Sequence, residues 1–162
     1  MIGIVVRFIC KGVLALENQP KVLVCITIQG NSKRLIEKGA KIARENAAQL
    51  HILHVEKGMS IFQKPESATL LEDLFKYGKE LGGEVHFVSD QNVSSRIIAF
   101  IRDMDVAQVV LGETMRGKLF KLLKRDISSH ISSEAKDLEV LVLERRPKPK
   151  ELPNLKSNEI VT

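Results

Sequence analysis

Polar residues suited to binding a small ligand follow two of the apolar stretches in this sequence. One polar segment, residues 29–32, comes directly after an apolar run, and the other, residues 112–117, opens with a glycine after a second apolar run. In an open parallel sheet, small molecules bind where the carboxyl ends of strands meet such loops, at the point where the strand order reverses. We therefore expect the two segments to face each other across a ligand crevice. The candidate ligand-binding residues are Thr27, Gln29, Gly30, Asn31, Ser32, Gly112, Thr114, Arg116, Gly117 and Arg125.

The chemistry expected at this crevice is recognition of an anion. A helix that begins near Ser32, with Asn31 or Ser32 as its cap, points its first backbone N–H groups toward the same edge of the sheet. A basic cluster lies beside the second segment, and basic side chains bind phosphates directly. An ordinary solvated helix surface is the alternative explanation for that cluster. The cluster comprises Arg116, Lys118, Lys121, Lys124 and Arg125.

The sequence contains no arrangement typical of catalysis or of metal binding. His51 and His54 are three residues apart in an expected strand, so their side chains point to opposite faces and cannot share a metal ion. His86 and His130 have no ligand-like neighbours in sequence. A Walker-type loop, a cysteine pair at metal-binding spacing and a Gly-x-Ser-x-Gly turn are all missing from the sequence. It therefore predicts a protein that is not an enzyme and has no metal site, with ATP hydrolysis as the least favoured alternative.

Apolar strands that alternate with amphipathic helices must position these residues. The expected strands are nearly continuous apolar runs, as in strands covered on both faces, and the connections are long enough for crossovers. This alternation predicts an α/β fold, a doubly wound parallel sheet with helices on both faces. Gly39 permits the first helix to approach the sheet closely, and Gly82 and Gly83 end the second helix. We expect strands at 22–28, 50–56, 84–89, 107–112 and 139–144, and helices at 32–47, 66–81, 93–103 and 118–136.

Composition and charge narrow the classes of function. The 162-residue chain has a net charge of +5, but residues 145–162 carry five basic and two acidic residues, which leaves a nearly neutral body. A domain that binds nucleic acid usually has a basic folded face, so that function is not expected. The stretch nearest to a membrane span, residues 1–16, is broken by Arg7 and Lys11. Two cysteines give no disulfide framework, and we expect a reducing, cytoplasmic setting.

The chain divides into one domain and two terminal segments. Residues 21–145 are expected to form the domain, which is long enough to bury a sizeable core. Residues 146–162 are rich in proline and charge, lack periodicity and are expected to be disordered. Residues 1–20 form an arm of unknown order, which fits an added edge strand, a partner-binding arm or part of a longer parent protein.

The pattern of residues 20–145 as a whole resembles a universal stress protein domain, above all the version in potassium-responsive sensor histidine kinases. The resemblance implies a Rossmann-like, five-stranded sheet of order 3-2-1-4-5 and a homodimer formed through the last strand, at Val140, Leu141, Val142 and Leu143. An exposed apolar last strand is an edge that needs cover, which agrees with pairing to a second copy. The segments that carry the resemblance are Lys21–Ile26, Ser32–Ala43, Leu50–Glu56, Val109–Thr114 and Leu138–Leu143.

The ATP-binding branch of that family has an acidic residue at the end of the first strand and a run Gly-x2-Gly-x9-Gly-Ser/Thr after the fourth. In this sequence Thr27 stands at the acidic position, and only Gly112 matches the glycine run. Met115, Arg125 and Asp126 stand at the other positions, and a carboxylate there repels phosphates. Ordinary ATP binding is therefore not expected, although ATP and AMP stay among the candidate ligands.

Cyclic di-AMP is a further candidate, because some sensor-kinase members of the family bind it through Ser-x-Ser and a later Phe-Thr-Ala-x-Tyr. The spacing of that pattern exists here between residues 27–29 and 50–54, but Thr27 is the only close substitute. His54 stands at the position of an aromatic anchor, where it could stack on an adenine. Packing of His54 within the sheet is the alternative.

These observations predict a universal stress protein-like signalling or binding module that senses an adenine nucleotide or another anionic ligand at the crevice. The alternative is a ligand-free, dimeric interaction protein or scaffold that contacts a protein partner. The first hypothesis predicts a saturable response to nucleotides, and the second predicts none.

Overall fold

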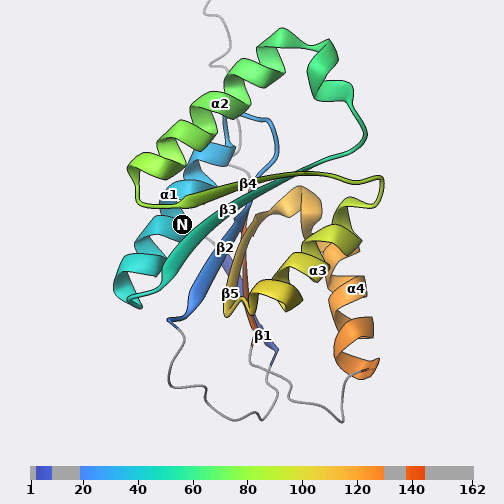
Figure 1. The fold of residues 1–162 in the computed structure, drawn as a ribbon. Coiled ribbons are helices and arrows are strands. Elements are labelled where there is room, and N and C mark those ends of the chain that lie inside the picture. Colours follow the sequence, from blue (N-terminus) through green and yellow to red (C-terminus); the bar gives the residue numbers. More distant parts are fainter. Residues whose placement is uncertain (1–2, 9–18, 130–137, 145–162) are drawn as a thin grey trace, which may run out of the picture.

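Five parallel strands form the body of one sheet in the computed structural model, which describes residues 3–8, 19–129 and 138–144 (Figure 1). The strands are β2 (Lys21–Cys25), β3 (Gln49–Glu56), β4 (Glu84–Ser89), β5 (Gln108–Gly112) and β6 (Leu138–Leu143). They lie in the order β4-β3-β2-β5-β6 and pair in parallel, which confirms the predicted order 3-2-1-4-5. The near-continuous apolar runs form these strands because both faces of the sheet are covered.

Two helices cover each face of the sheet, as the alternating pattern predicts (Figure 1). The helices on one face are α1 (Ser32–Glu45) and α2 (Pro65–Glu80), and those on the other are α3 (Val93–Met104) and α4 (Arg116–Ser129). Two short 3-10 helices, η1 (Ser60–Gln63) and η2 (Glu113–Met115), lie in connections that the sequence predicts as loops. The last part of the fourth expected helix, residues 130–136, lies outside the described residues.

The helix ends follow from backbone conformation. α1 ends at Glu45, earlier than predicted, and Ala47 then adopts a φ of 49° that a right-handed helix does not allow. α2 ends just before Gly82, whose φ of 87° suits glycine, which confirms the predicted helix stop. The two ends place the chain at the starts of β3 and β4 respectively.

Alternate residues of β2 enter two separate apolar cores, because successive side chains of a strand point to opposite faces. Val22 and Val24 pack beneath α1 and α2, whereas Leu23 packs beneath α3 and α4. Gly39 is buried against the first of these cores, and a Cβ atom on it would lie 2.1 Å from Cγ2 of Val24. This confirms that Gly39 lets α1 approach the sheet closely.

The thiol of Cys25 lies in the core beneath α3 and α4 and is expected to be unreactive in the folded protein. Its exposed fraction is 1%, and burial raises its pKa from 9.0 to about 12. In a Cys10→Ser variant at about pH 8, iodoacetamide should therefore leave the native chain unmodified and label it in denaturant, as mass spectrometry would show. Because unfolding restores the ordinary pKa, stability should also fall as the pH rises from 9.0 toward about 12. Rapid labelling of native Cys25 would contradict its burial.

A sixth strand, β1 (Gly3–Phe8), extends the sheet at its β6 edge. It pairs antiparallel to β6, in a register that runs from Gly3 opposite Leu143 to Phe8 opposite Leu138. Of the three alternatives for the amino-terminal arm, the described part is therefore an added edge strand. The expectation that Val140–Leu143 form an open edge is wrong, because β1 already occupies the hydrogen-bonding groups on that side of β6. Dimerisation through β6 stays a prediction that requires β1 to move.

The remaining predictions about the terminal segments lie outside the described residues, which include neither 9–18 nor the expected disordered tail, 146–162. Within the described ranges, no helix combines the length and the apolar character that crossing a bilayer requires.

Candidate functional site

The two polar segments meet at the carboxyl-terminal edge of the sheet, where the crevice is predicted. β2 and β5 are neighbouring parallel strands, with Val24 opposite Val110. The strand order reverses between them, because β3 and β4 lie on one side and β6 on the other. The crevice is lined by Thr27, Gln29, Asn31, Ser32, Arg34, Leu35, Gly112, Glu113, Thr114, Leu143 and Glu144.

Six of the ten residues predicted from sequence line this crevice, and three of the four others lie in α4. Those in its lining are Thr27, Gln29, Asn31, Ser32, Gly112 and Thr114. Gly30, Arg116 and Gly117 are exposed and lie outside the lining. Arg125 lies in α4, and its side chain is outside the described part of the structure. The loop after β2 and the first residues after β5 thus line the crevice, whereas α4 contributes no described side chain to it, and ligand binding by these residues stays a prediction.

The crevice is nearly closed in this conformation. Its volume is about 20 Å³, enough for about one water molecule. Ligand pockets in proteins typically hold about 300–1,000 Å³, so a nucleotide needs the crevice to open. Met115 does not cause the closure, because its side chain packs toward the core beneath α3 and α4.

Hydrogen bonds within the loop that follows β2 keep this loop compact. The buried hydroxyl Oγ of Ser32 donates to the carbonyl of Thr27 at 2.5 Å, and the backbone N–H of Thr27 lies 3.3 Å from the same Oγ. The N–H groups of Ser32 and Arg34 donate to the carbonyls of Gln29 and Asn31 at 3.0 and 3.2 Å. The first N–H groups of α1 are therefore already paired in this conformation, and an anion site at the helix start stays a prediction.

Arg34 is the cation among the described residues of the crevice lining, and the sequence pattern did not indicate it. Its Nη1 atom donates to Oδ1 of Asn31 at 3.3 Å and to the carbonyl of Glu144 at 3.4 Å, both long for hydrogen bonds. The available signal was its position in the first turn of α1, three residues after Asn31. The carboxylates of Glu113 and Glu144 also line the crevice. Among the described lining residues, one cation against two carboxylates disfavours a polyphosphate more than a ligand with a single negative charge.

The basic cluster of α4 lies elsewhere. The guanidinium of Arg116 is 5.9 Å from the ring centroid of Phe120, and its residue is exposed. Lys118 and Lys121 are exposed as well. For these described side chains, the solvated helix surface is the better of the two explanations.

His54, the candidate adenine-stacking residue, is buried with an exposed fraction of 5%. Its Nδ1 atom lies 3.1 Å from the carbonyl of Ile26, and its Nε2 atom lies 2.6 Å from Oε2 of Glu56. Because a carbonyl only accepts hydrogen bonds, Nδ1 of His54 carries a proton. Nε2 of His54 and the carboxylate of Glu56 share a second proton. His54 thus holds the carbonyl of Ile26, just after β2, and packing within the sheet is the better of the two explanations for this buried ring.

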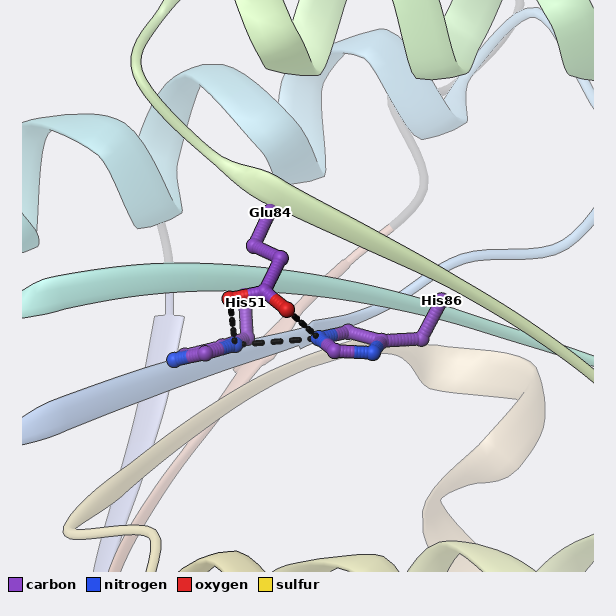
Figure 2. Close-up of side chains that lie close together, drawn as sticks. All are labelled: His51, Glu84 and His86. Atoms are coloured by element: carbon purple, nitrogen blue, oxygen red, sulfur yellow. Dashed lines mark hydrogen bonds and ion pairs between the residues drawn. The ribbon is translucent and has the colours of Figure 1, made fainter.

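A possible metal-binding group lies at the opposite edge of the sheet, where the sequence predicts none. His51, Glu84 and His86 come together at the amino-terminal ends of β3 and β4 (Figure 2). A hollow with a volume of about 520 Å³ also lies at this edge, with His51 and Glu84 in its lining. As predicted, His51 and His54 point to opposite faces, and the partner of His51 comes instead from the neighbouring strand.

Comparison with known proteins identifies relatives in sequence and in structure. No protein-family model matches the chain. The chain is 26% identical over 124 residues to the "Sensor protein KdpD" of Mycobacterium tuberculosis (strain CDC 1551 / Oshkosh), covering 76% of this chain and 14% of that protein. A Burkholderia pseudomallei protein of the universal stress protein family superposes with a TM-score of 0.55 at 16% identity, covering 78% of this chain and 96% of that one.

A second solved structure, a universal stress protein in complex with cAMP, superposes with a TM-score of 0.50 at 16% identity. It covers 78% of this chain and 96% of that chain. At these identities the two structural matches establish the fold, and the sequence match establishes the relation to a sensor protein of which this chain spans a small part.

Proposed function

Because this chain has the universal stress protein fold and is related in sequence to the KdpD sensor proteins, we propose that it is a signalling module that responds to a nucleotide. Its task is binding and not catalysis. The ligand class is an adenine nucleotide with a single phosphate, such as AMP or cAMP, held in the crevice between the β2 and β5 loops. Cyclic di-AMP and ATP are less favoured, since the described part of the crevice lining offers one cation and His54 is buried.

The observation that carries this proposal is the convergence of polar side chains from two distant segments at the switch point of the sheet. The side chains of Gln29, Asn31 and Thr114 offer donors and acceptors for a base or a ribose. Arg34 supplies the donor fork that suits a phosphate. Support also comes from the solved relative that binds cAMP on the same fold.

Binding requires the crevice to open, and Arg34 is the side chain that opens it. Its two acceptors are at 3.3 and 3.4 Å, so little is lost when the guanidinium turns toward a phosphate. The ligand then favours an open conformation over the closed one, and this shift of population is the signal. When Arg34 turns, it releases the carbonyl of Glu144. Glu144 directly follows β6, so this release couples the crevice to the β1–β6 edge.

Calorimetric titration with AMP, cAMP, ATP and cyclic di-AMP tests the proposal. We expect saturable binding of AMP or cAMP, weaker binding of ATP, and at least about a tenfold loss of affinity in Arg34→Ala, because a hydrogen bond to a charged group is removed. Arg116→Ala is the matched control, since its guanidinium lies over Phe120 and away from the crevice. Equal losses in the two variants, or a loss in Arg116→Ala alone, would place the ligand elsewhere.

A second candidate function, a ligand-free interaction module, is favoured by one observation. The crevice holds about 20 Å³ and its lining contains two carboxylates, so a closed, empty site is consistent with a scaffold role. This candidate predicts no response to any nucleotide of the panel. It also predicts a specific protein partner whose capture is lost when residues 1–20 or 145–162 are removed.

A further inference from the structure

Two histidines and a carboxylate from neighbouring strands form a compact cluster far from the crevice in the fold. β3 and β4 pair in parallel with His51 opposite Glu84 and Leu53 opposite His86. Glu84 and His86 are two residues apart on β4, so they share a face of the sheet, and that face also carries His51. Figure 2 shows the three side chains converging on one point between the strands.

The distances within the cluster suit a shared metal ion. Nδ1 of His51 lies 3.0 Å from Nε2 of His86, and Glu84 oxygens lie 3.8 Å from the first and 4.0 Å from the second. Ligands about 2.0–2.1 Å from a tetrahedral zinc ion are about 3.3 Å apart, so the two nitrogens are almost in place. Glu84 has a side chain 68% exposed, and a small rotation brings its carboxylate into range.

The hydrogen bonds of His51 leave a lone pair on its Nδ1 atom, which is the nitrogen that faces the proposed metal position. Its Nε2 atom lies 3.3 Å from Oε1 of Gln49, an acceptor, so Nε2 carries the proton and Nδ1 faces His86 unprotonated. Metal-binding histidines generally hold their second ring nitrogen in this way.

We propose that His51, Glu84 and His86 bind a divalent transition-metal ion of the zinc class. Imidazole nitrogens select such ions over magnesium and calcium, which prefer sites made of oxygen atoms. In the metal-free protein, Nε2–H of His86 donates to Nδ1 of His51; when the ion binds, the His86 ring changes tautomer by proton exchange with solvent, so that Nδ1 carries the proton and the Nε2 lone pair binds the ion. Three protein ligands leave at least one coordination position for water, and the exposed carboxylate and the adjacent hollow of about 520 Å³ give the ion a path from solvent.

This site is independent of the proposed nucleotide crevice. It lies at the amino-terminal ends of β3 and β4, whereas the crevice lies at the carboxyl-terminal ends of β2 and β5. Either one can therefore fail its test without the other.

Titration of the full chain with Zn²⁺, after removal of any histidine tag and of bound metal, tests the proposal. Calorimetry and metal analysis after dialysis should show one saturable equivalent of Zn²⁺ and no comparable binding of Mg²⁺. Glu84→Gln and His86→Ala should each weaken Zn²⁺ binding by at least about tenfold, since even indirect support of a metal ligand is worth that much. Glu84→Gln is the safer variant for folding, because Glu84 is exposed.

Two control variants separate this site from general surface binding. Glu72→Gln removes an exposed carboxylate on α2, and His130→Ala removes a histidine that is not one of the three proposed ligands; both should bind Zn²⁺ like the original chain. Histidine ring resonances in NMR spectra should shift for His51 and His86 and not for His54. The proposal is overturned if one equivalent does not bind, if Glu84→Gln and His86→Ala both retain full affinity, or if His130→Ala abolishes binding.

Discussion

Replacement of His54 by leucine is expected to lower the free energy of unfolding by about 3–5 kcal/mol, the usual loss when one partner of a buried polar pair is removed. Oε2 of Glu56 lies 2.6 Å from Nε2 of His54, and the Glu56 residue has an exposed fraction of 8%. The carbonyl of Ile26 would lose its donor as well. Urea denaturation monitored by circular dichroism measures the loss, provided that the denaturant dependence of the free energy is unchanged.

A double variant distinguishes the energy of the His54–Glu56 interaction from the effect of changing the size of each side chain. His54→Leu/Glu56→Leu removes both partners, so it should lose less stability than the sum of the two single variants, with a coupling of about 0.5–3 kcal/mol. Strict additivity would show that the two residues act independently. Because His54 holds the carbonyl just before Thr27, His54→Leu should also loosen the crevice loop, and amide hydrogen exchange at residues 27–32 should speed up.

Gly39→Ala is expected to lower the free energy of unfolding by about 1–3 kcal/mol through overpacking. The new Cβ atom would lie 2.1 Å from Cγ2 of Val24, a residue with an exposed fraction of 0% and a stiff β-branched side chain. α1 would therefore have to move away from β2. The packing of α1 against β2 positions Thr27 and Ser32. The same denaturation measurement detects the effect.

Gly30→Ala is the matched control for this prediction. Gly30 lies in the loop between β2 and α1, and a Cβ atom on it would meet nothing within 4 Å. We expect a change within about 0.5 kcal/mol, as for most surface substitutions. Equal effects at Gly30 and Gly39 would mean that the close approach of α1 to the sheet is not under steric control.

The fold could be predicted from the sequence because the sequence features that indicate it are local and periodic. The apolar runs of β2 and β5 are continuous, the helices between strands repeat every three to four residues, and Gly82 marks a helix end. Such features need no knowledge of distant contacts. β1 was harder to place, because a short apolar arm is compatible with several partners and only its pairing with β6 decides among them.

The location of the crevice could be predicted from sequence, but not every side chain that lines it. Thr27, Asn31 and Thr114 lie in the lining because loops at strand ends must share one edge of a parallel sheet. Arg34 lies in the lining and Arg116 outside it, and the sequence did not indicate this because both lie on helices, where the direction of a side chain depends on how the helix is rotated against the sheet.

The histidine cluster was missed for a different reason. His51 and His86 are 35 residues apart, and they meet only because β3 and β4 are neighbours in a particular register. The Glu-x-His spacing at residues 84–86 was visible as two potential ligands on one face of a strand. Its third member becomes evident only when the adjacent strand and its register are known.

Titration of isotope-labelled protein with AMP or cAMP, followed residue by residue in NMR spectra, tests most directly whether the crevice binds a nucleotide. The account predicts saturable shifts of the amide signals of Thr27, Ser32, Arg34, Gly112 and Thr114, with the exposed face of α4 unaffected. Shifts confined to α4 or to the hollow at the opposite edge, or none at all at millimolar nucleotide, would contradict it and leave the domain as a scaffold.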